Sequence, residues 1–177
     1  MIMLETHRLR LRRITLDDVD DLHAVFSDPV AMQHYPKPFD RQMTIGWIEW
    51  NLRNYAEHGF GLWAVIHKEE DRLIGDCGLT IQRVEGVDEL EIGYHILRSH
   101  WGQGYATEAA AACRDYAFDD LKRKWVISWM SSDNMASRRV AEKVGMRLEK
   151  ETTNKDGDAS VVYAMAPADR DDARGQR

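Results

Sequence analysis

The chain has 177 residues, of which 44% are hydrophobic and 31% are charged, and its formal net charge at pH 7 is −6. These values fit one soluble globular domain with a substantial core. The negative charge argues against nucleic acid as a main partner, because phosphate binding needs a basic face, and it mildly favours cationic substrates.

The sequence shows no sign of a membrane or metal protein. The first residues, MIMLETHRLRLRR, mix charges with apolar residues and do not resemble a signal peptide. No run of about 18 apolar residues could span a membrane. Cys77 and Cys113 lack metal-ligand spacing, and the histidines contain no HExxH motif. We therefore expect a cytoplasmic protein with reduced thiols, no metal and no membrane partner.

Hydrophobic periodicity and turn residues predict alternating strands and helices. In chain order we expect a strand at 7–14, helices at 17–26 and 41–57, strands at 60–66, 72–81 and 89–97, a helix at about 105–119, a strand at 125–130, a helix at 135–144, and strands at 146–153 and 160–166. Short turns join the three middle strands into an antiparallel meander. One domain should span residues 1–167, and the apolar-poor tail 168–177 should be disordered.

Residues 101–109, WGQGYATEA, lead from the strand at 89–97 into the next helix with few bulky side chains. A bare loop before a helix exposes unpaired backbone N–H groups at the positive end of the helix dipole, which together form an anion site. A P-loop needs GxxxxGK[ST], which is absent. A dinucleotide fingerprint needs GxGxxG or GxGxxA, but Thr107 follows Gly102 and Gly104 where that residue belongs, and the preceding strands form a meander.

The same segment, following EIGYHI, resembles the acetyl-CoA loop of the GNAT N-acetyltransferases, in particular the RimJ/RimL-like branch of ribosomal-protein N-terminal acetyltransferases. The superfamily pattern Q/R-x-x-G-x-G/A falls on Trp101, Gly104 and Ala106. Trp101 departs from the usual Gln or Arg, and an aromatic residue is common there in that branch. A second segment, NMASRRVAEKVGM at 134–146, resembles the branch pattern N-x-x-S-x-x-V-x-E-K-x-G-M/F.

The resemblance extends over residues 7–166 and implies an α/β fold of the GNAT type, with a mixed, mainly antiparallel sheet of six to seven strands flanked by about four helices. It implies that acetyl passes from acetyl-CoA to a primary amine, on a protein N-terminus or a small molecule, by direct attack in a ternary complex. Two alternatives remain: a non-catalytic acyl-CoA-binding regulatory module, and a transferase of a longer acyl group such as succinyl. Both a monomer and a homodimer remain possible.

The resemblance also implies which residues bind the coenzyme. The backbone N–H groups that would hold the pyrophosphate are those of Gly102, Gln103, Gly104, Tyr105, Ala106 and Thr107. The pantetheine arm would pair with the backbone of His95, Ile96 and Leu97, in a strand that splays away from its neighbour. Arg98 would contact phosphate or remain solvated. Asn134 would bond the pantetheine arm, cap its own helix, or do both with different atoms.

Three residues are candidates for proton transfer. Ser137 is implied to lie near the thioester sulfur, where it could donate a proton to the leaving thiolate or bind it; the alternative is a small polar residue of the first helical turn. Tyr163 is the rival acid, unless it is a core aromatic. A primary amine is mostly protonated at neutral pH, so a base is needed. Glu91 is the candidate because it lies nearer the splayed end than Glu89, unless it is a surface charge.

The acceptor pocket is expected at the end of the fold that the first two helices and their loop cover in GNAT proteins. Tyr35, Trp47 and Trp50 should line this pocket together with Glu89. The helix at 41–57 has an apolar stripe beside the two tryptophans, formed by Ile45, Ile48, Leu52 and Tyr55.

Overall fold

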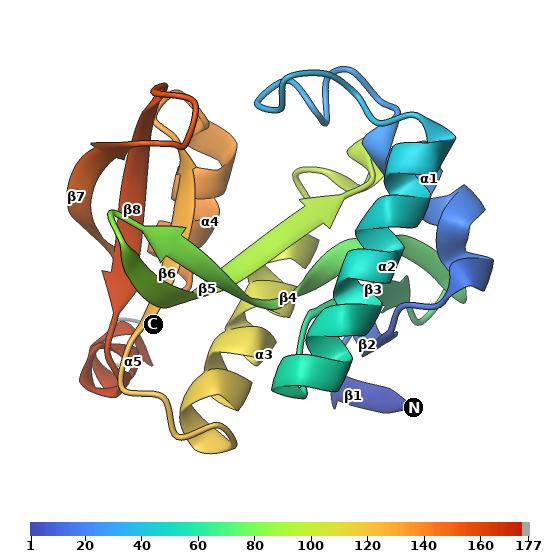
Figure 1. Cartoon of the computed structure of the whole chain (residues 1–177). Coiled ribbons are helices and arrows are strands. Elements are labelled where there is room, and N and C mark those ends of the chain that lie inside the picture. Colours follow the sequence, from blue (N-terminus) through green and yellow to red (C-terminus); the bar gives the residue numbers. More distant parts are fainter. Residues whose placement is uncertain (175–177) are drawn as a thin grey trace.

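The computed structural model describes the backbone of residues 1–174 and the side chains of residues 1–170. Eight strands form a single sheet in the order β1-β2-β3-β4-β5-β6-β8-β7. The strands are β1 (Ile2–Glu5), β2 (Leu9–Arg13), β3 (Leu62–His67), β4 (Arg72–Val84), β5 (Val87–Ile96), β6 (Val126–Ser131), β7 (Arg147–Thr153) and β8 (Ala159–Met165). The helices are α1 (Val19–Phe26), α2 (Arg41–His58), α3 (Tyr105–Asp119), α4 (Met135–Lys143) and α5 (Pro167–Arg174) (Figure 1).

The predicted α/β class and mainly antiparallel sheet are confirmed. All neighbouring strands pair antiparallel except β5 and β6, which are parallel. The sheet exceeds the predicted six to seven strands because β1, which pairs with β2, was not predicted. Its four residues are too few to show a periodic pattern.

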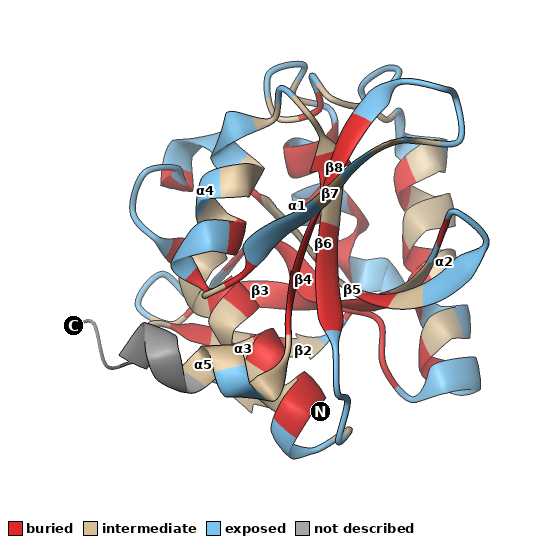
Figure 2. Ribbon diagram, turned by 90° about the vertical axis from the view of Figure 1, so that its left-hand side faces the viewer, coloured by how far each residue is buried: buried red, intermediate tan, exposed pale blue. Residues whose placement is uncertain are grey.

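Helices cover both faces of the sheet, as the alternation along the strands requires. On β3, Leu62, Ala64 and Ile66 pack in a cluster with α1 and α2, whereas Trp63 and Val65 pack in the cluster that contains α3. Figure 2 shows the buried residues concentrated in the central strands. Since successive residues point to opposite faces, a site between two central strands is open to both layers of helices.

The sheet divides between β5 and β6. These two strands pair through one residue pair, Glu91 with Ile127. β5 continues along β4 as far as Ile96, and β6 continues along β8 as far as Ser131. Beyond Glu91 the two strands therefore diverge, and we call the gap between residues 92–96 and 128–131 the fork. In Figure 1 the fork separates the half with α1 and α2 from the half with β7, β8 and α4.

The packed face of α2 differs from the predicted stripe. Ile48 and Tyr55 are buried as expected, but Leu52 is 38% exposed, and Asn51 is fully buried in its place. The Asn51 side chain accepts a hydrogen bond from Leu62 N (2.8 Å) and donates one to Trp47 O (3.0 Å). A polar side chain that satisfies backbone groups thus fixes α2 to the start of β3.

Replacing Asn51 with Ala is expected to destabilise the protein by about 1–3 kcal/mol, because the buried Leu62 N–H loses its acceptor. Urea unfolding measures this change. Glu49→Ala, at an exposed position of the same helix, serves as the control and should change stability by less than about 0.5 kcal/mol. Equal stabilities of the two variants would contradict a structural role for the Asn51 amide.

The C-terminal segment corrects a second prediction. Residues Pro167–Arg174 form α5, so the expected disorder of the tail from residue 168 is wrong up to residue 174, and residues 175–177 lie outside the described part. The Arg170 guanidinium forms an ion pair with Asp119 at the end of α3 (2.7 Å). Composition suggested disorder because the segment has few apolar residues, but charge pairing with α3 holds the helix start.

The described residues were also compared with the expectations for membrane spans, metal ligands and thiols. No helix among them is long and apolar enough to cross a membrane, and they hold no group of three potential metal-ligating side chains. Cys77 and Cys113 are both buried free thiols, with 3.6 Å between their sulfur atoms. Both lie in the core between β4 and α3.

Candidate active site

A cavity of about 1390 Å³ passes through the fork. β5 supplies side chains to it from both faces: Glu91 and His95 lie on the side of α1 and α2, whereas the Tyr94 hydroxyl donates a hydrogen bond to Ser137 O in α4 (2.9 Å). The cavity also reaches the start of α3 and the segment before α2. Two molecules entering from opposite faces of the sheet can therefore meet in the fork.

The start of α3 forms an open backbone cradle. Gly102 and Gly104 have φ angles of +75° and +83°, a region that favours glycine. Gly104 is the N-cap of α3 and, as a glycine, has no side chain that could bond to the first N–H groups of the helix. Among the described residues, a Cβ on Gly102 would have no neighbour within 4 Å, and one on Gly104 would meet only Arg8 Nη2, at 3.5 Å. The first N–H groups of an α-helix have no partner within the helix, and the two glycines leave room for a phosphate to approach those of α3.

Arg8 braces this cradle, a role that its sequence position did not reveal. Its guanidinium pairs with Glu108 through Nε (2.7 Å) and donates to Gln103 O through Nη1 (2.9 Å). The same group lies 4.3 Å from the centre of the Tyr105 ring. The loop conformation is therefore held by a residue about a hundred positions away in the chain.

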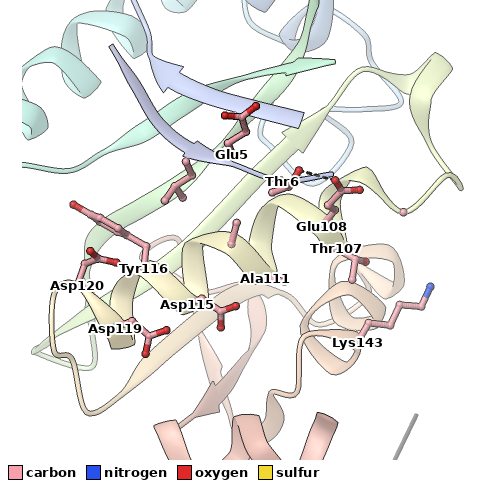
Figure 3. A pocket seen from close by; sticks show the side chains of 13 residues that line it. Glu5, Thr6, Thr107, Glu108, Ala111, Asp115, Tyr116, Asp119, Asp120 and Lys143 are labelled. Carbon is pink, nitrogen blue, oxygen red and sulfur yellow. Dashed lines mark hydrogen bonds between the residues drawn. The ribbon is translucent and has the colours of Figure 1, made fainter. Parts of the chain in front are cut away.

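A second hollow, of about 720 Å³, lies on the outer side of α3 beside β1. Figure 3 shows Thr6 bonded to Glu108 at its edge, with Glu5, Asp115, Asp119 and Asp120 around it. So many carboxylates disfavour phosphate. The fork cavity is the better candidate for the coenzyme.

The structure brings only part of the predicted coenzyme set to the fork cavity. Tyr105, Ala106 and Thr107 line it together with both loop glycines, whereas Gln103 does not. His95 and Ile96 line it, but Leu97 and Arg98 do not. Leu97 N donates to Ile74 O (2.7 Å), because the chain still follows β4 there, and Arg98 pairs with Asp28 (2.9 Å).

Trp101 occupies the position where the GNAT pattern has Gln or Arg. Its indole N–H donates to Ile96 O (2.6 Å), so the tryptophan fastens the loop to the end of β5. One backbone acceptor that the sequence assigned to pantetheine is thus already used.

Asn134 and Ser137 both line the cavity at the start of α4. The Asn134 side-chain oxygen accepts from Ser137 N (3.1 Å), which is the capping role, and its NH₂ group is the part left for a ligand.

Tyr163, the rival acid, does not line the cavity. Its hydroxyl accepts from Arg138 Nε (3.1 Å) and donates to Glu142 (2.9 Å). The structure therefore does not bring Tyr163 to the fork, whereas Tyr94 lines the cavity and bonds Ser137 O.

Glu91 lies at the point where the fork opens. One carboxylate oxygen accepts from Trp129 N (3.1 Å) and the other from Thr80 Oγ1 (3.3 Å). Burial outweighs these bonds and raises the pKa of Glu91 to about 7. A carboxyl group with this pKa is partly protonated at neutral pH and can exchange protons there. Glu89 lies nearer the closed end of the sheet, opposite Gln82, and does not line the cavity.

The predicted aromatic residues lie on the acceptor side of the cavity, and an aspartate that the sequence analysis did not predict lies behind them. Tyr35, Trp47 and Trp50 line it. Behind them lies Asp76, which is fully buried and accepts from Trp47 Nε1 (2.8 Å). His95 lies between Asp76 and Tyr35, with its Nδ1 2.7 Å from Asp76 Oδ1 and its Nε2 2.6 Å from the Tyr35 hydroxyl. The one available signal was an aspartate within the apolar strand LIGDCGL.

The fold is that of an acyltransferase. Residues 8–147 match the family described as the acetyltransferase (GNAT) domain, and the chain belongs to that family. It is 40% identical over 161 residues to the uncharacterized protein YkkB of Bacillus subtilis (strain 168), covering 90% of this chain and 93% of that protein.

Solved structures agree with this membership. The acetyltransferase from Agrobacterium tumefaciens str. C58 superimposes with a TM-score of 0.79 at 30% identity, covering 92% of each chain. RimL, a ribosomal L7/L12 alpha-N-protein acetyltransferase solved with coenzyme A, superimposes with a TM-score of 0.77 at 20% identity, covering 94% of this chain and 98% of that one. The predicted resemblance to GNAT proteins with RimL-like neighbours is confirmed.

Proposed function

We propose that the protein transfers acetyl from acetyl-CoA to a primary amine, which attacks the thioester directly. The observation that carries this proposal is the cavity through the fork, which joins the uncapped start of α3 to the carboxyl group of Glu91. One end suits a phosphate-bearing coenzyme and the other suits a group that must lose a proton.

Groups at the starts of two helices, α3 and α4, would bind the coenzyme. The N–H groups of Tyr105, Ala106 and Thr107 would hold the pyrophosphate, and the NH₂ group of Asn134 would bond the pantetheine arm. Acetyl-CoA supplies the acetyl group as a thioester. The crystallised complex of RimL with coenzyme A supports this assignment by analogy of fold.

The chemistry divides between the two faces of the sheet. Glu91 would accept a proton from the amine, through water, so that the nitrogen lone pair becomes available. On the other face the Ser137 hydroxyl, with Tyr94 bonded to its carbonyl, would donate a hydrogen bond or a proton to the departing thiolate. Cys77 and Cys113 do not line the cavity, which favours direct transfer over a cysteine acyl-enzyme. Much of the rate enhancement would then come from holding the two substrates in line.

Ser137→Ala is expected to lower kcat while leaving the affinity for acetyl-CoA nearly unchanged, because the contact strengthens only as charge develops on sulfur. Loss of one such donor typically costs about 10²-fold in kcat, and a partly exposed hydroxyl should cost about tenfold. Steady-state kinetics and calorimetric titration with acetyl-CoA separate the two effects. An unchanged kcat would assign the role to Tyr94 or to water.

The test of the function is release of coenzyme A thiol in the presence of three amines: phenethylamine, spermidine and a tetrapeptide with a free N-terminus. Mass spectrometry of the amine identifies the N-acetyl product. Repeating the assay with succinyl-CoA distinguishes a transferase of longer acyl groups. Binding of acetyl-CoA without turnover of any amine would instead indicate a regulatory module.

A further inference from the structure

A chain of hydrogen bonds leads from the buried carboxylate of Asp76 to the fork cavity. Trp47 Nε1 can only donate, so it fixes one oxygen of Asp76 as an acceptor. The other oxygen lies 2.7 Å from His95 Nδ1. With Asp76 accepting at both of its oxygens, we assign the hydrogen of a neutral His95 to Nδ1.

The direction of the remaining bond follows from this tautomer. In a neutral imidazole with the hydrogen on Nδ1, Nε2 is an acceptor. The Tyr35 hydroxyl, 2.6 Å away, must then donate its only hydrogen to His95. The Tyr35 oxygen keeps two lone pairs at the cavity wall, and it can serve any further partner only as an acceptor.

We propose that the Tyr35 oxygen binds an N–H group of the attacking amine, and that His95 and Asp76 are positioning residues that keep Tyr35 in this acceptor state. This inference rests on the proposed function and deepens it. A primary amine has hydrogens to spare, so one can be held by Tyr35 while Glu91 takes another. An alcohol acceptor has a single hydrogen and cannot satisfy both groups, which gives the site a reason to prefer amines.

The surroundings of His95 support a fixed orientation. Its ring packs edge-on against Phe26 and Trp47, with centroid separations of 5.3 and 5.7 Å. The carboxylates of Asp76 and Glu91 face His95, and the Tyr35 phenol is a further titratable neighbour. Burial raises the pKa of Tyr35, which keeps its hydroxyl protonated and able to donate to His95.

The reaction remains balanced with these roles. The ammonium form of the acceptor gives one proton to Glu91, and the neutral nitrogen forms the C–N bond as the C–S bond breaks. The second proton leaves the nitrogen for the thiolate side. Tyr35 gains and loses no proton overall, because it only orients the nitrogen lone pair toward the thioester carbon.

Two substitutions of His95 distinguish a hydrogen bond to Tyr35 from mere filling of space: one keeps an acceptor for the Tyr35 hydroxyl and the other removes it. The side-chain amide of Gln reaches about as far as Nε2 of histidine, so His95→Gln can still present an oxygen acceptor to Tyr35. The amide of Asn reaches only as far as Nδ1, so His95→Asn retains a donor for Asp76 but leaves Tyr35 without an acceptor. Tyr35→Phe removes the hydroxyl and keeps the ring beside Phe39.

The experiment measures kcat/KM with saturating acetyl-CoA and the best of the three amines, together with acetyl-CoA affinity and thermal unfolding of each variant. We expect Tyr35→Phe and His95→Asn each to lower kcat/KM roughly 10- to 100-fold, with acetyl-CoA affinity unchanged. His95→Gln should stay within about threefold of the wild type. The double variant Tyr35→Phe/His95→Asn should lose no more than Tyr35→Phe alone, because the two residues act as one unit.

Equal losses for His95→Gln and His95→Asn, or losses that multiply in the double variant, would overturn the inference, since His95 would then act otherwise than through Tyr35. So would a Tyr35→Phe variant with normal kcat/KM in an active enzyme. Absence of turnover by the wild type with all three amines is a separate result and would count against the proposed function itself.

Discussion

Glu91→Gln is expected to lower kcat/KM for a primary amine about 100-fold at neutral pH, the lower end for loss of a general base. Glutamine preserves the shape of the side chain, and its carbonyl oxygen can still accept from Trp129 N, so the fork should remain intact. What is lost is basicity at the point where β5 and β6 separate. Glu89→Gln is the matched control, because Glu89 lies on the same strand outside the cavity, and it should change kcat/KM little.

The pH dependence sharpens this prediction. With the pKa of Glu91 raised to about 7, kcat/KM of the wild type should rise through that pH as the carboxylate forms, and rise further as the amine itself loses its proton. Glu91→Gln should lack the lower rise, and its deficit should shrink at high pH, where free amine is abundant. Superimposable profiles for the variant and the wild type would leave the amine's proton to bulk water.

The raised pKa of Glu91 should also make the folded protein less stable as the pH rises. The pKa of Glu91 is about 7 in the folded protein against 4.5 for an ordinary glutamate. The folded state therefore holds this proton more tightly, and its contribution to stability is present below pH 4.5 and is lost as the pH rises through about 7. Urea unfolding at several pH values should show that the free energy of unfolding falls less for Glu91→Gln than for the wild type as the pH rises across this interval.

Gly104→Val is expected to weaken acetyl-CoA binding roughly 10- to 100-fold, the loss of one or two bonds between N–H groups and a charged phosphate. Its Cβ would meet Arg8 Nη2 at 3.5 Å at the N-cap of α3, and its two methyl groups would add bulk where a phosphate must approach. A β-branched residue at a φ of +83° is also strained, so some stability should be lost as well.

Gly86→Val provides the control for strain. Gly86 has a φ of +84° and, among the described residues, no atom within 4 Å of its would-be Cβ, but it lies in the turn between β4 and β5. Both variants should therefore lose similar stability in urea unfolding, and only Gly104→Val should lose affinity in calorimetry. Similar affinities for the two variants would show that the cradle is misplaced.

Local patterns in the sequence account for most of the fold. The helices and strands from residue 9 to 165 follow the predicted order, because each carries a periodicity that its own residues define. The glycine loop at 102–104 could likewise be predicted from the sequence, because the positive φ angles of Gly102 and Gly104 favour glycine at those positions. Single-domain organisation over residues 1–167 and a cytoplasmic location remain predictions.

What could not be predicted depends on contacts between distant segments. Arg8 reaches Glu108 and Gln103, and Asp76 meets both Trp47 and His95, and no local pattern encodes these meetings. Tyr163 was ambiguous because β8 is buried on both faces, and alternation alone does not say which face borders the fork. The resemblance to GNAT proteins assigns a role to the backbone of His95 and none to its side chain.

If the acceptor amine and acetyl-CoA occupy the fork together and react directly, both must be bound before any product leaves. Initial rates measured over a grid of acetyl-CoA and amine concentrations distinguish this ternary complex from an acyl-enzyme. We expect double-reciprocal lines that intersect, and no acetylated protein after incubation with acetyl-CoA alone. Parallel lines together with a stoichiometric acetyl group on the protein would instead show an acyl-enzyme and exclude direct transfer.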